Sequence, residues 1–547
     1  MSSAARQTTP AGGLRDWQVR ALDAMASWTE GSFLVNAAPG AGKTRPALEF
    51  ARREIAAGRA RRVVVVCPTG PLTRQWAEAA ARSGLQIEPD SDELVPPKGF
   101  HGIAVTYARV AMAGVRWAAA CTPDTLIVAD EAHHLGEDLA WGLGFSAAFS
   151  KAQRWLLLSG TPFRSDASAI PGVRYDGEGL AEPDISYGYA DAVRDGVCRP
   201  VAFITYDGSL SWRSGDDVIE AGFDTVLTGR EASRRYRTAI STELPDGLPR
   251  ILREAHAKLL GVRSAEGGQR DAGGLVIAAD GEHAKKVAKL LREVTGKPPT
   301  VVLHTEARAA EKLQRFTASK DEWIVAVNMV SEGVDIPRLR VGVYASAAKT
   351  AMIFRQIVGR FVRTIPGRPP ELSWLYLPAD PILRIHASEV ETEVRPFVRR
   401  KDEDEDLGEW DEVSQRKETE RGEAVEFVPL VADVAPQMTL FGGPAPAEPV
   451  RPVSVPVTPG MTDDLPGLPE PAAELPAYQK RRILREKRHG LVNDLKRRGR
   501  YGGPQEINAW LNRETGVAKV GDASIEQLEK SIELLMQALT KGSRARR

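Results

Sequence analysis

The residues best suited to do chemistry lie between positions 37 and 44, where the sequence reads AAPGAGKT. An apolar stretch from Phe33 to Val35 precedes this run, and a helix-like stretch begins near Pro46. A glycine-bearing loop between a strand and a helix can wrap phosphates in backbone N–H groups. Lys43 would reach the β- and γ-phosphate oxygens, and the Thr44 hydroxyl would hold Mg²⁺. The predicted loop residues are Ala38, Pro39, Gly40, Ala41, Gly42, Lys43 and Thr44.

An ordinary glycine turn that caps a helix would also explain this loop, since Ala37 stands where the first glycine of a phosphate loop is usual. A second motif favours the nucleotide site. The apolar run Thr125 to Ala129 leads directly into Asp130 and Glu131. Asp130 is placed to hold Mg²⁺ through its water shell, and Glu131 to orient and deprotonate the attacking water. An exposed acidic turn is a poor alternative after so apolar a run, so the two motifs together predict binding and hydrolysis of ATP.

A hydroxyl-bearing motif, Ser159 to Arg164, follows another apolar run. Its small side chains could bond to the region of Asp130 and His133 and report the state of the phosphate. Alone, the motif would be only a turn that ends a strand. His133 itself is either a core histidine or the link between the two motifs.

The second half of the chain supplies two more motifs. Residues 331–337 follow a strand and contain Gly333 and Asp335, which we assign to nucleotide binding. Residues 356–363 are predicted to be a helix, on which Gln356, Arg360 and Arg363 fall at i, i+4 and i+7 and so share one face. A guanidinium near the γ-phosphate stabilises charge during phosphoryl transfer, so Arg360 and Arg363 are candidate arginine fingers. They would act only when two domains close.

Two stretches of alternating apolar strands and helical patterns predict two doubly wound α/β domains with parallel sheets, at residues 14–185 and 186–400. The first set of strands is 63–66, 103–106, 125–128 and 155–158. The second is 201–205, 274–278, 300–303, 323–327, 342–345 and 372–377. Residues 1–13 are expected to be a flexible N-terminus.

The composition changes after residue 400. Eight of the eleven residues from Asp402 to Glu412 are acidic, and eleven prolines lie between 436 and 476, so we predict a linker over 401–477. Residues 478–547 carry seventeen Lys or Arg against eight Asp or Glu and are expected to form a basic helical module. Ser524 and Gln527 resemble a capping box at the start of its last helix. This module could contact phosphates or could dock on the acidic run, and we keep both interpretations.

The overall composition limits the class of protein. The 547 residues are enough for two to four domains, and 73 basic residues balance 73 acidic ones, so net charge does not decide for or against a nucleic-acid partner. The three cysteines, Cys67, Cys121 and Cys198, lie too far apart for paired zinc ligands and are odd in number for a disulfide framework. We therefore expect them to be buried thiols of a protein in a reducing cytosol. No uninterrupted run of about 18 apolar residues appears, so we expect a cytoplasmic protein without a membrane segment.

The ordered set of motifs resembles superfamily 2 helicases and translocases, especially the motor subunits of type I and type III restriction enzymes. The set comprises residues 14–18 (LRDWQ), the phosphate loop, the DEAH sequence at 130–133, the SGTP sequence at 159–162 and the QxxGRxxR pattern at 356–363. The resemblance covers about residues 14–380. It implies two RecA-like domains with ATP between them, with Gln18 and Arg15 contacting the adenine. About thirteen residues precede the first motif, so no N-terminal nuclease is expected.

The same resemblance implies a nucleic-acid partner, with DNA favoured over RNA. Unwinding, translocation and a nucleotide-switched clamp without strand separation all remain open. Candidate contacts are hydroxyl and amide groups where helices begin, and each could equally be a simple helix cap. They are residues 68–72 with Arg74 and Gln75, Thr106-Tyr107, His304-Thr305 and Ser331.

Overall fold

The computed structural model describes residues 13–160, 169–177, 181–227, 229–303, 306, 308–327, 336–365, 367–368, 371–398, 427–436, 476–497 and 503–541. The chain forms two compact units. The first contains the described residues within 1–37, 42–186 and 456–547, and the second contains those within 38–41 and 187–455. Gly333 and Asp335, assigned above to nucleotide binding, and the acidic run 402–412 lie outside the described residues.

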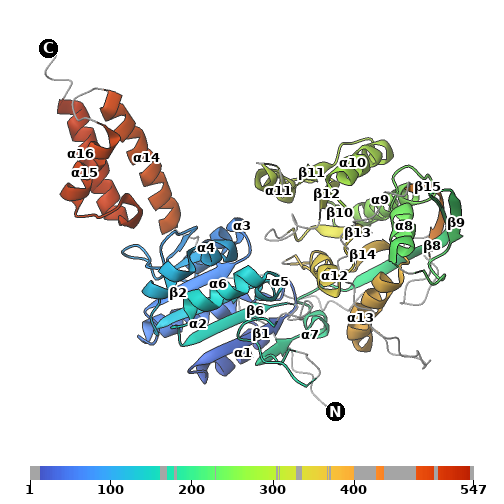
Figure 1. Cartoon of the computed structure of the whole chain (residues 1–547), viewed down its shortest axis with the longest axis horizontal. Helices are drawn as coiled ribbons and strands as arrows, with labels where there is room; N and C mark the ends of the chain where they lie inside the picture. The colour runs from blue at the N-terminus through green and yellow to red at the C-terminus, as the bar shows by residue number, and fades with distance from the viewer. Residues whose placement is uncertain are drawn as a thin grey trace. The chain divides into compact units, whose positions relative to one another are not determined.

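The first unit is built on a seven-stranded sheet (Figure 1, blue to cyan). Its strands, in spatial order, are β3 (Ile87–Pro89), β4 (Gly102–Thr106), β2 (Arg62–Cys67), β5 (Thr125–Asp130), β6 (Arg154–Ser159), β1 (Gly31–Ala37) and β7 (Ile185–Tyr187). The pairs from β3 to β1 are all parallel. Every residue of β2 and β5 is buried, as expected for parallel strands covered on both faces.

Helices precede or connect these strands. They are α1 (Asp16–Ala26), α2 (Thr44–Ala56), α3 (Gly70–Arg82), α4 (Tyr107–Ala120), α5 (His134–Glu137) and α6 (Leu139–Phe149). One core cluster joins the sheet to α4 and α6 through residues such as Ile127, Trp117 and Phe145. The predicted parallel α/β fold is therefore present in this unit.

The second unit contains an eight-stranded sheet. Seven strands follow the order β11 (Thr300–Val302), β12 (Trp323–Val327), β10 (Gly273–Ala278), β13 (Leu339–Ala345), β14 (Ser373–Pro378), β8 (Val201–Ser214) and β15 (Phe427–Pro436), and β9 (Asp217–Ala221) also pairs with β8. The pairs from β11 to β8 are parallel, whereas β9 and β15 are antiparallel to β8. Its helices are α7 (Tyr189–Arg194), α8 (Gly229–Ala239), α9 (Leu248–Ser264), α10 (Gly281–Thr295), α11 (Ala309–Ala318), α12 (Ala351–Val358) and α13 (Pro381–Val398).

Strand β15 corrects the predicted linker over 401–477, because residues 427–436 belong to the second sheet. Ala432 and Val434 are buried in this strand, and the residues between and beside them are more exposed. Alternate side chains therefore pack on the core, as in an antiparallel edge strand. Strand β8 also continues nine residues beyond the predicted end at Thr205, to Ser214, and so provides the edge that β15 needs.

The C-terminal module consists of α14 (Ala477–Arg497), α15 (Pro504–Thr515), a 3₁₀ turn at Val520–Asp522 and α16 (Ile525–Lys541), drawn in red in Figure 1. Its core contains Val492, Leu495, Ile507, Leu511 and Leu535. The predicted capping box is confirmed: Ser524 N donates to Gln527 Oε1 at 2.9 Å, and Gln527 N donates to Ser524 Oγ at 3.2 Å.

Two composition-based predictions can be compared with the structure. Cys67, Cys121 and Cys198 are all buried free thiols, as predicted. Among the described residues, no helix combines the length and the apolar character needed to cross a bilayer.

Candidate nucleotide site

The loop after β1 has the backbone that phosphate binding requires. Gly40 and Gly42 adopt φ angles of +82° and +91°, in the left-handed region that residues with side chains rarely enter. Lys43 follows as the N-cap residue of α2, and Thr44 is the first residue of that helix. The backbone N–H groups at the start of α2 therefore lie directly after the loop, where an anion is stabilised by the helix terminus.

Gln18 fixes the start of α1 to this loop. Its side chain is buried, its Nε2 donates to Gly42 O at 3.0 Å, and its Oε1 accepts from Arg15 N at 2.9 Å. A Cβ on Gly42 would lie 3.0 Å from Gln18 Nε2 and 3.4 Å from Arg15 Nη1, so any side chain at position 42 would crowd both residues. Both residues assigned to the adenine thus lie beside the phosphate loop, and their contact with the base stays a prediction.

Asp130 ends β5 as a buried carboxylate whose two oxygens both have donors. Oδ2 accepts from Trp76 Nε1 at 2.7 Å, and Oδ1 accepts from Glu131 N at 3.1 Å. Tyr107 OH donates to the Asp130 carbonyl at 2.8 Å. Burial, and then the charge of Glu131, raise the pKa of Asp130 above its ordinary value. Such a carboxylate gains stability when a cation approaches, which fits the predicted Mg²⁺ ligand.

Glu131 adopts a φ of +51°, which is unusual for a residue with a side chain and costs energy. Its Oε1 lies 3.3 Å from Lys43 Nζ, and its Oε2 lies 3.6 Å from His133 Nδ1. Burial alone would raise the pKa of Glu131, but the nearby Lys43, His133 and His134 outweigh it and lower that pKa. The backbone turn therefore brings the predicted water-activating carboxylate to the phosphate-loop lysine.

Ser159 completes this cluster from the end of β6. Its Oγ lies 3.1 Å from His133 Nδ1, and both side chains are buried. Ala132 N also donates to Leu158 O at 2.9 Å. The predicted contact between Ser159 and His133 is confirmed, whereas Thr161 to Arg164 lie outside the described residues. His133 thus joins the acidic motif to the end of the next strand.

The prediction of a helix through residue 363 is wrong, because α12 ends at Val358 with Gly359 as its C-cap. Phe361 is buried against Gly342, where a Cβ would lie only 2.4 Å from the phenyl ring. Arg363 then forms an antiparallel bridge with Cys198. The chain leaves the helix to bury this ring, so Gln356, Arg360 and Arg363 do not share one helical face.

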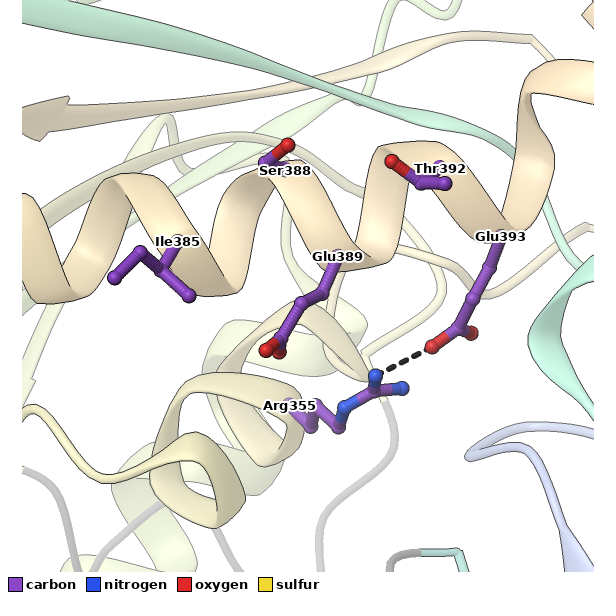
Figure 2. Close-up of a pocket in the computed structure, with 6 residues that line it drawn as sticks. All are labelled: Arg355, Ile385, Ser388, Glu389, Thr392 and Glu393. Atoms are coloured by element: carbon purple, nitrogen blue, oxygen red, sulfur yellow. Dashed lines mark hydrogen bonds and ion pairs between the residues drawn. The ribbon is translucent and has the colours of Figure 1, made fainter. Parts of the chain in front are cut away.

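Arg355, the neighbour of Gln356, forms an ion pair with Glu393 of α13, which ties the two helices together (Figure 2). A cavity of about 520 Å³ lies at this contact and is lined by Arg355, Ile385, Ser388, Glu389, Thr392 and Glu393. None of the predicted site residues lines it. The Arg355 pair serves to anchor the helix that carries Gln356.

The candidate nucleic-acid contacts differ in whether their side chains already have a partner within the protein. Thr106 Oγ1 accepts from Arg109 N at 3.3 Å, so this hydroxyl is a helix cap. Arg74 Nε pairs with Asp90 at 3.2 Å. Thr69, by contrast, is the N-cap residue of α3 without a side-chain cap bond. His304, Thr305 and Ser331 lie outside the described residues.

Sequence reasoning missed Trp76, the residue that holds Asp130. Trp76 lies on the buried face of α3 together with Thr73, Ala77 and Ala80, so its position has the pattern of an ordinary core residue. The indole N–H of a buried tryptophan usually finds a hydrogen-bond acceptor, and this tendency is the one signal that the sequence offers. That signal does not identify the acceptor.

Comparisons with known proteins agree with the motifs. Residues 12–164 match the family model for the res subunit of type III restriction enzymes. Rv2917, an uncharacterized protein of Mycobacterium tuberculosis (strain ATCC 25618 / H37Rv), is 39% identical over 444 residues, which are 79% of this chain and 72% of that protein.

Two solved structures are also similar. The DNA-bound, ATP-dependent type ISP restriction-modification enzyme LlaBIII has a TM-score of 0.47 at 15% identity, covering 71% of this chain and 30% of LlaBIII. Dbp5 of S. cerevisiae, bound to RNA and ADP BeF3, has a TM-score of 0.45 at 13% identity, covering 70% of this chain and 88% of Dbp5. By its mycobacterial relative the chain belongs to the family that includes Rv2917, and its residues 12–164 carry the domain of the type III restriction-enzyme res subunit, in keeping with the superfamily 2 motifs of the sequence.

Proposed function

We propose that the protein is a nucleic-acid-dependent ATPase that moves along or unwinds DNA. The observation that carries this proposal is the cluster of Lys43, Glu131 and Asp130 beside a glycine loop of the right backbone form. A lysine, a water-activating carboxylate and a metal-binding carboxylate are the groups that ATP hydrolysis needs. A purely structural ion pair would need neither the two left-handed glycines nor the strained Glu131.

Lys43 is held by Glu131 in the structure, and this pairing suggests how the site responds to a nucleotide. A γ-phosphate would draw Lys43 away from Glu131 and remove one of the charges that lower the pKa of that carboxyl. Glu131 would then be a stronger base, able to take a proton from water. Mg²⁺, held by Thr44 and Asp130, would neutralise charge on the phosphates.

The remaining assignments are proposals of the same kind. Arg15 and Gln18 would contact the adenine, and Gly333 and Asp335 would contact the nucleotide from the second domain. Gln356, Arg360 and Arg363 would complete the site when the domains at 14–185 and 186–400 close. These three residues follow the pattern of motor proteins even though α12 ends before Arg360. The buried free cysteines support a reducing, cytoplasmic location.

DNA is the favoured partner because the first domain matches a family of restriction-enzyme subunits. RNA is the alternative within the same superfamily. A third possibility is a nucleotide-switched clamp that holds nucleic acid without separating its strands. All three possibilities need the same ATP-site residues. The nucleic-acid partner and the separation of strands must therefore be measured.

The test is the ATPase rate on a panel of single-stranded, duplex and forked DNA and RNA, with strand displacement measured alongside. We expect DNA to stimulate hydrolysis, Lys43→Ala to lose ATP binding or turnover, and Glu131→Gln to bind ATP but hydrolyse it about 10²- to 10⁴-fold more slowly. Glu30→Gln, at an exposed position of the same domain, is the matched control. Normal turnover by Glu131→Gln would refute the assignment of the base. Stimulated hydrolysis without displaced strands would favour a translocase or a clamp.

A further inference from the structure

The C-terminal module is fastened to the first sheet domain by contacts that neither sequence interpretation anticipated. Tyr478 OH, at the start of α14, donates to Glu78 Oε1 on α3 at 2.9 Å. Arg481 and Arg485, one and two turns further along α14, place Nη1 atoms 2.5 and 3.3 Å from Glu88 Oε1 on β3. The partner of the basic helix is thus a pair of glutamates in the first domain.

This junction is buried. Arg481 is 0% exposed and Glu88 is 8% exposed. The same guanidinium donates through Nε to Ala523 O at 2.9 Å within the module and lies 5.5 Å from the centre of the Phe100 ring. Exposed ion pairs contribute little, but breaking a buried pair leaves an uncompensated charge. The pairing is therefore specific, because removing either partner from the docked junction would leave the other charge buried and uncompensated.

Glu88 lies two residues before a turn that holds the first part of α3. Asp90 adopts a φ of +54°, accepts from Thr73 Oγ1 at 2.8 Å and pairs with Arg74. Tyr478 contacts the same helix directly at Glu78. The docked module therefore supports α3 at two points, through β3 at one and through its own tyrosine at the other.

Helix α3 also holds the metal-binding carboxylate of the proposed ATP site. Trp76, which lies between Thr73 and Glu78, donates to Asp130 Oδ2 at 2.7 Å. Hydrogen bonds weaken steeply once the donor and acceptor separate or lose alignment. A small shift or rotation of α3 would therefore loosen Asp130 before it disturbed the rest of the sheet.

We propose that the C-terminal helical module is a positioning element for the ATP site and acts through α3. Docking on Glu78 and Glu88 holds α3 in place, and α3 holds Asp130 through Trp76. This inference rests on the proposed ATPase function, to which it adds a reason for the module to pack on this edge of the sheet. Tyr478, Arg481 and Arg485 are positioning residues, since none of them touches Asp130.

The experiment uses full-length protein with Tyr478→Phe, which deletes one hydroxyl, and with the double change Tyr478→Phe/Glu88→Gln. Lys530→Gln, at an exposed position of α16, is the control for altering the module. Two quantities are measured: hydrogen–deuterium exchange of residues 70–82 without nucleotide, and the Mg²⁺ concentration that gives half-maximal ATPase. We expect faster exchange and a roughly three- to tenfold higher Mg²⁺ requirement in the double variant, a smaller shift in Tyr478→Phe, and wild-type behaviour in the control.

A second comparison separates positioning from general destabilisation. If the module acts through Trp76, adding the docking changes to Trp76→Phe should raise the Mg²⁺ requirement little further, because coupled changes are not additive. Additive effects would overturn the proposal, and so would unchanged exchange of α3 or an unchanged Mg²⁺ requirement in the double variant. A wild-type protein that hydrolyses no ATP would instead refute the proposed function, and the exchange measurement would still report whether docking supports α3.

Discussion

Replacing Trp76 with phenylalanine tests the support of Asp130 with the smallest available change. The variant keeps an aromatic ring in the core but removes the indole N–H that donates to Asp130 Oδ2 at 2.7 Å. A hydrogen bond to a charged group contributes about 1.5–3 kcal/mol. If that energy fixes the carboxylate for Mg²⁺, its loss should lower kcat/KM for Mg·ATP by about ten- to a hundredfold. The assay is steady-state ATPase over a Mg²⁺ titration.

Trp117 provides a matched control in the same domain. It is buried like Trp76, and among the described residues its Nε1 has no hydrogen-bond acceptor. Trp117→Phe therefore removes a similar amount of ring from the core without removing a bond to the site, so it reports the thermal stability lost with the ring alone, and Trp76→Phe should lose at least as much. Wild-type Mg²⁺ dependence in Trp76→Phe, or an equal loss of ATPase in Trp117→Phe, would refute the role assigned to Trp76.

Three further changes test other parts of the structure. Ser159→Ala removes the contact with His133, so we expect near-normal basal hydrolysis but weaker stimulation by nucleic acid, measured as the ratio of the two rates. Glu54→Gln leaves the buried Arg154 without its carboxylate and should cost about 3–5 kcal/mol in urea unfolding at neutral pH. Because Arg59 and Arg154 lower the pKa of Glu54 despite its burial, that difference should shrink as the pH falls below the ordinary glutamate value. Val434→Asp places a charge under β15 and should lower the melting temperature, whereas the same change at the exposed Val431 should not.

The parallel strands were predictable because a strand covered on both faces must be apolar along its whole length. The run Val63 to Val66 and the run Trp323 to Val327 meet this condition and form β2 and β12. Strand β15 does not meet it, because only alternate residues are buried and Pro429 interrupts the run. Proline is tolerated in an edge strand. The acidic and proline-rich residues on either side of 427–436 nevertheless indicated a linker, so the strand was not predicted.

The motifs proposed for the nucleotide site stand out in the sequence for a chemical reason. Phosphate binding and water activation demand particular residue types directly after a strand, so Lys43 and Glu131 stand out from their neighbours. The contacts that support these residues do not demand a particular residue type at a fixed place after a strand. Trp76 lies on the buried face of α3, and Glu88 lies on a short edge strand, so nothing in their local pattern indicates Asp130 or Arg481 as partners. Those pairings depend on which elements meet in space.

The early end of α12 shows the same limit for the second domain. Periodicity alone continues the helix to Arg363, because Gln356, Arg360 and Arg363 have helical spacing. The observed turn is set by Phe361, which fills the space left by Gly342 on β13. Packing against a strand nineteen residues earlier in the chain therefore overrides a local pattern. A candidate arginine finger should be assigned from such packing rather than from spacing.

The basic residues of α14 fall into two groups, those engaged within the protein and those exposed to solvent. Only the exposed group is available for the phosphate contacts that the sequence suggested. Arg481 and Arg485 face Glu88, and Arg488 donates to Ser531 Oγ at 2.7 Å, so these three cations are engaged within the protein. Lys487 and Lys496 are exposed. Each phosphate contact on a single strand contributes about −0.7 to the slope of log affinity against log salt. Phosphate contact by these two lysines therefore predicts that Lys487→Gln/Lys496→Gln makes this slope shallower by about 1.4, while an unchanged slope would remove both lysines from the phosphate contacts.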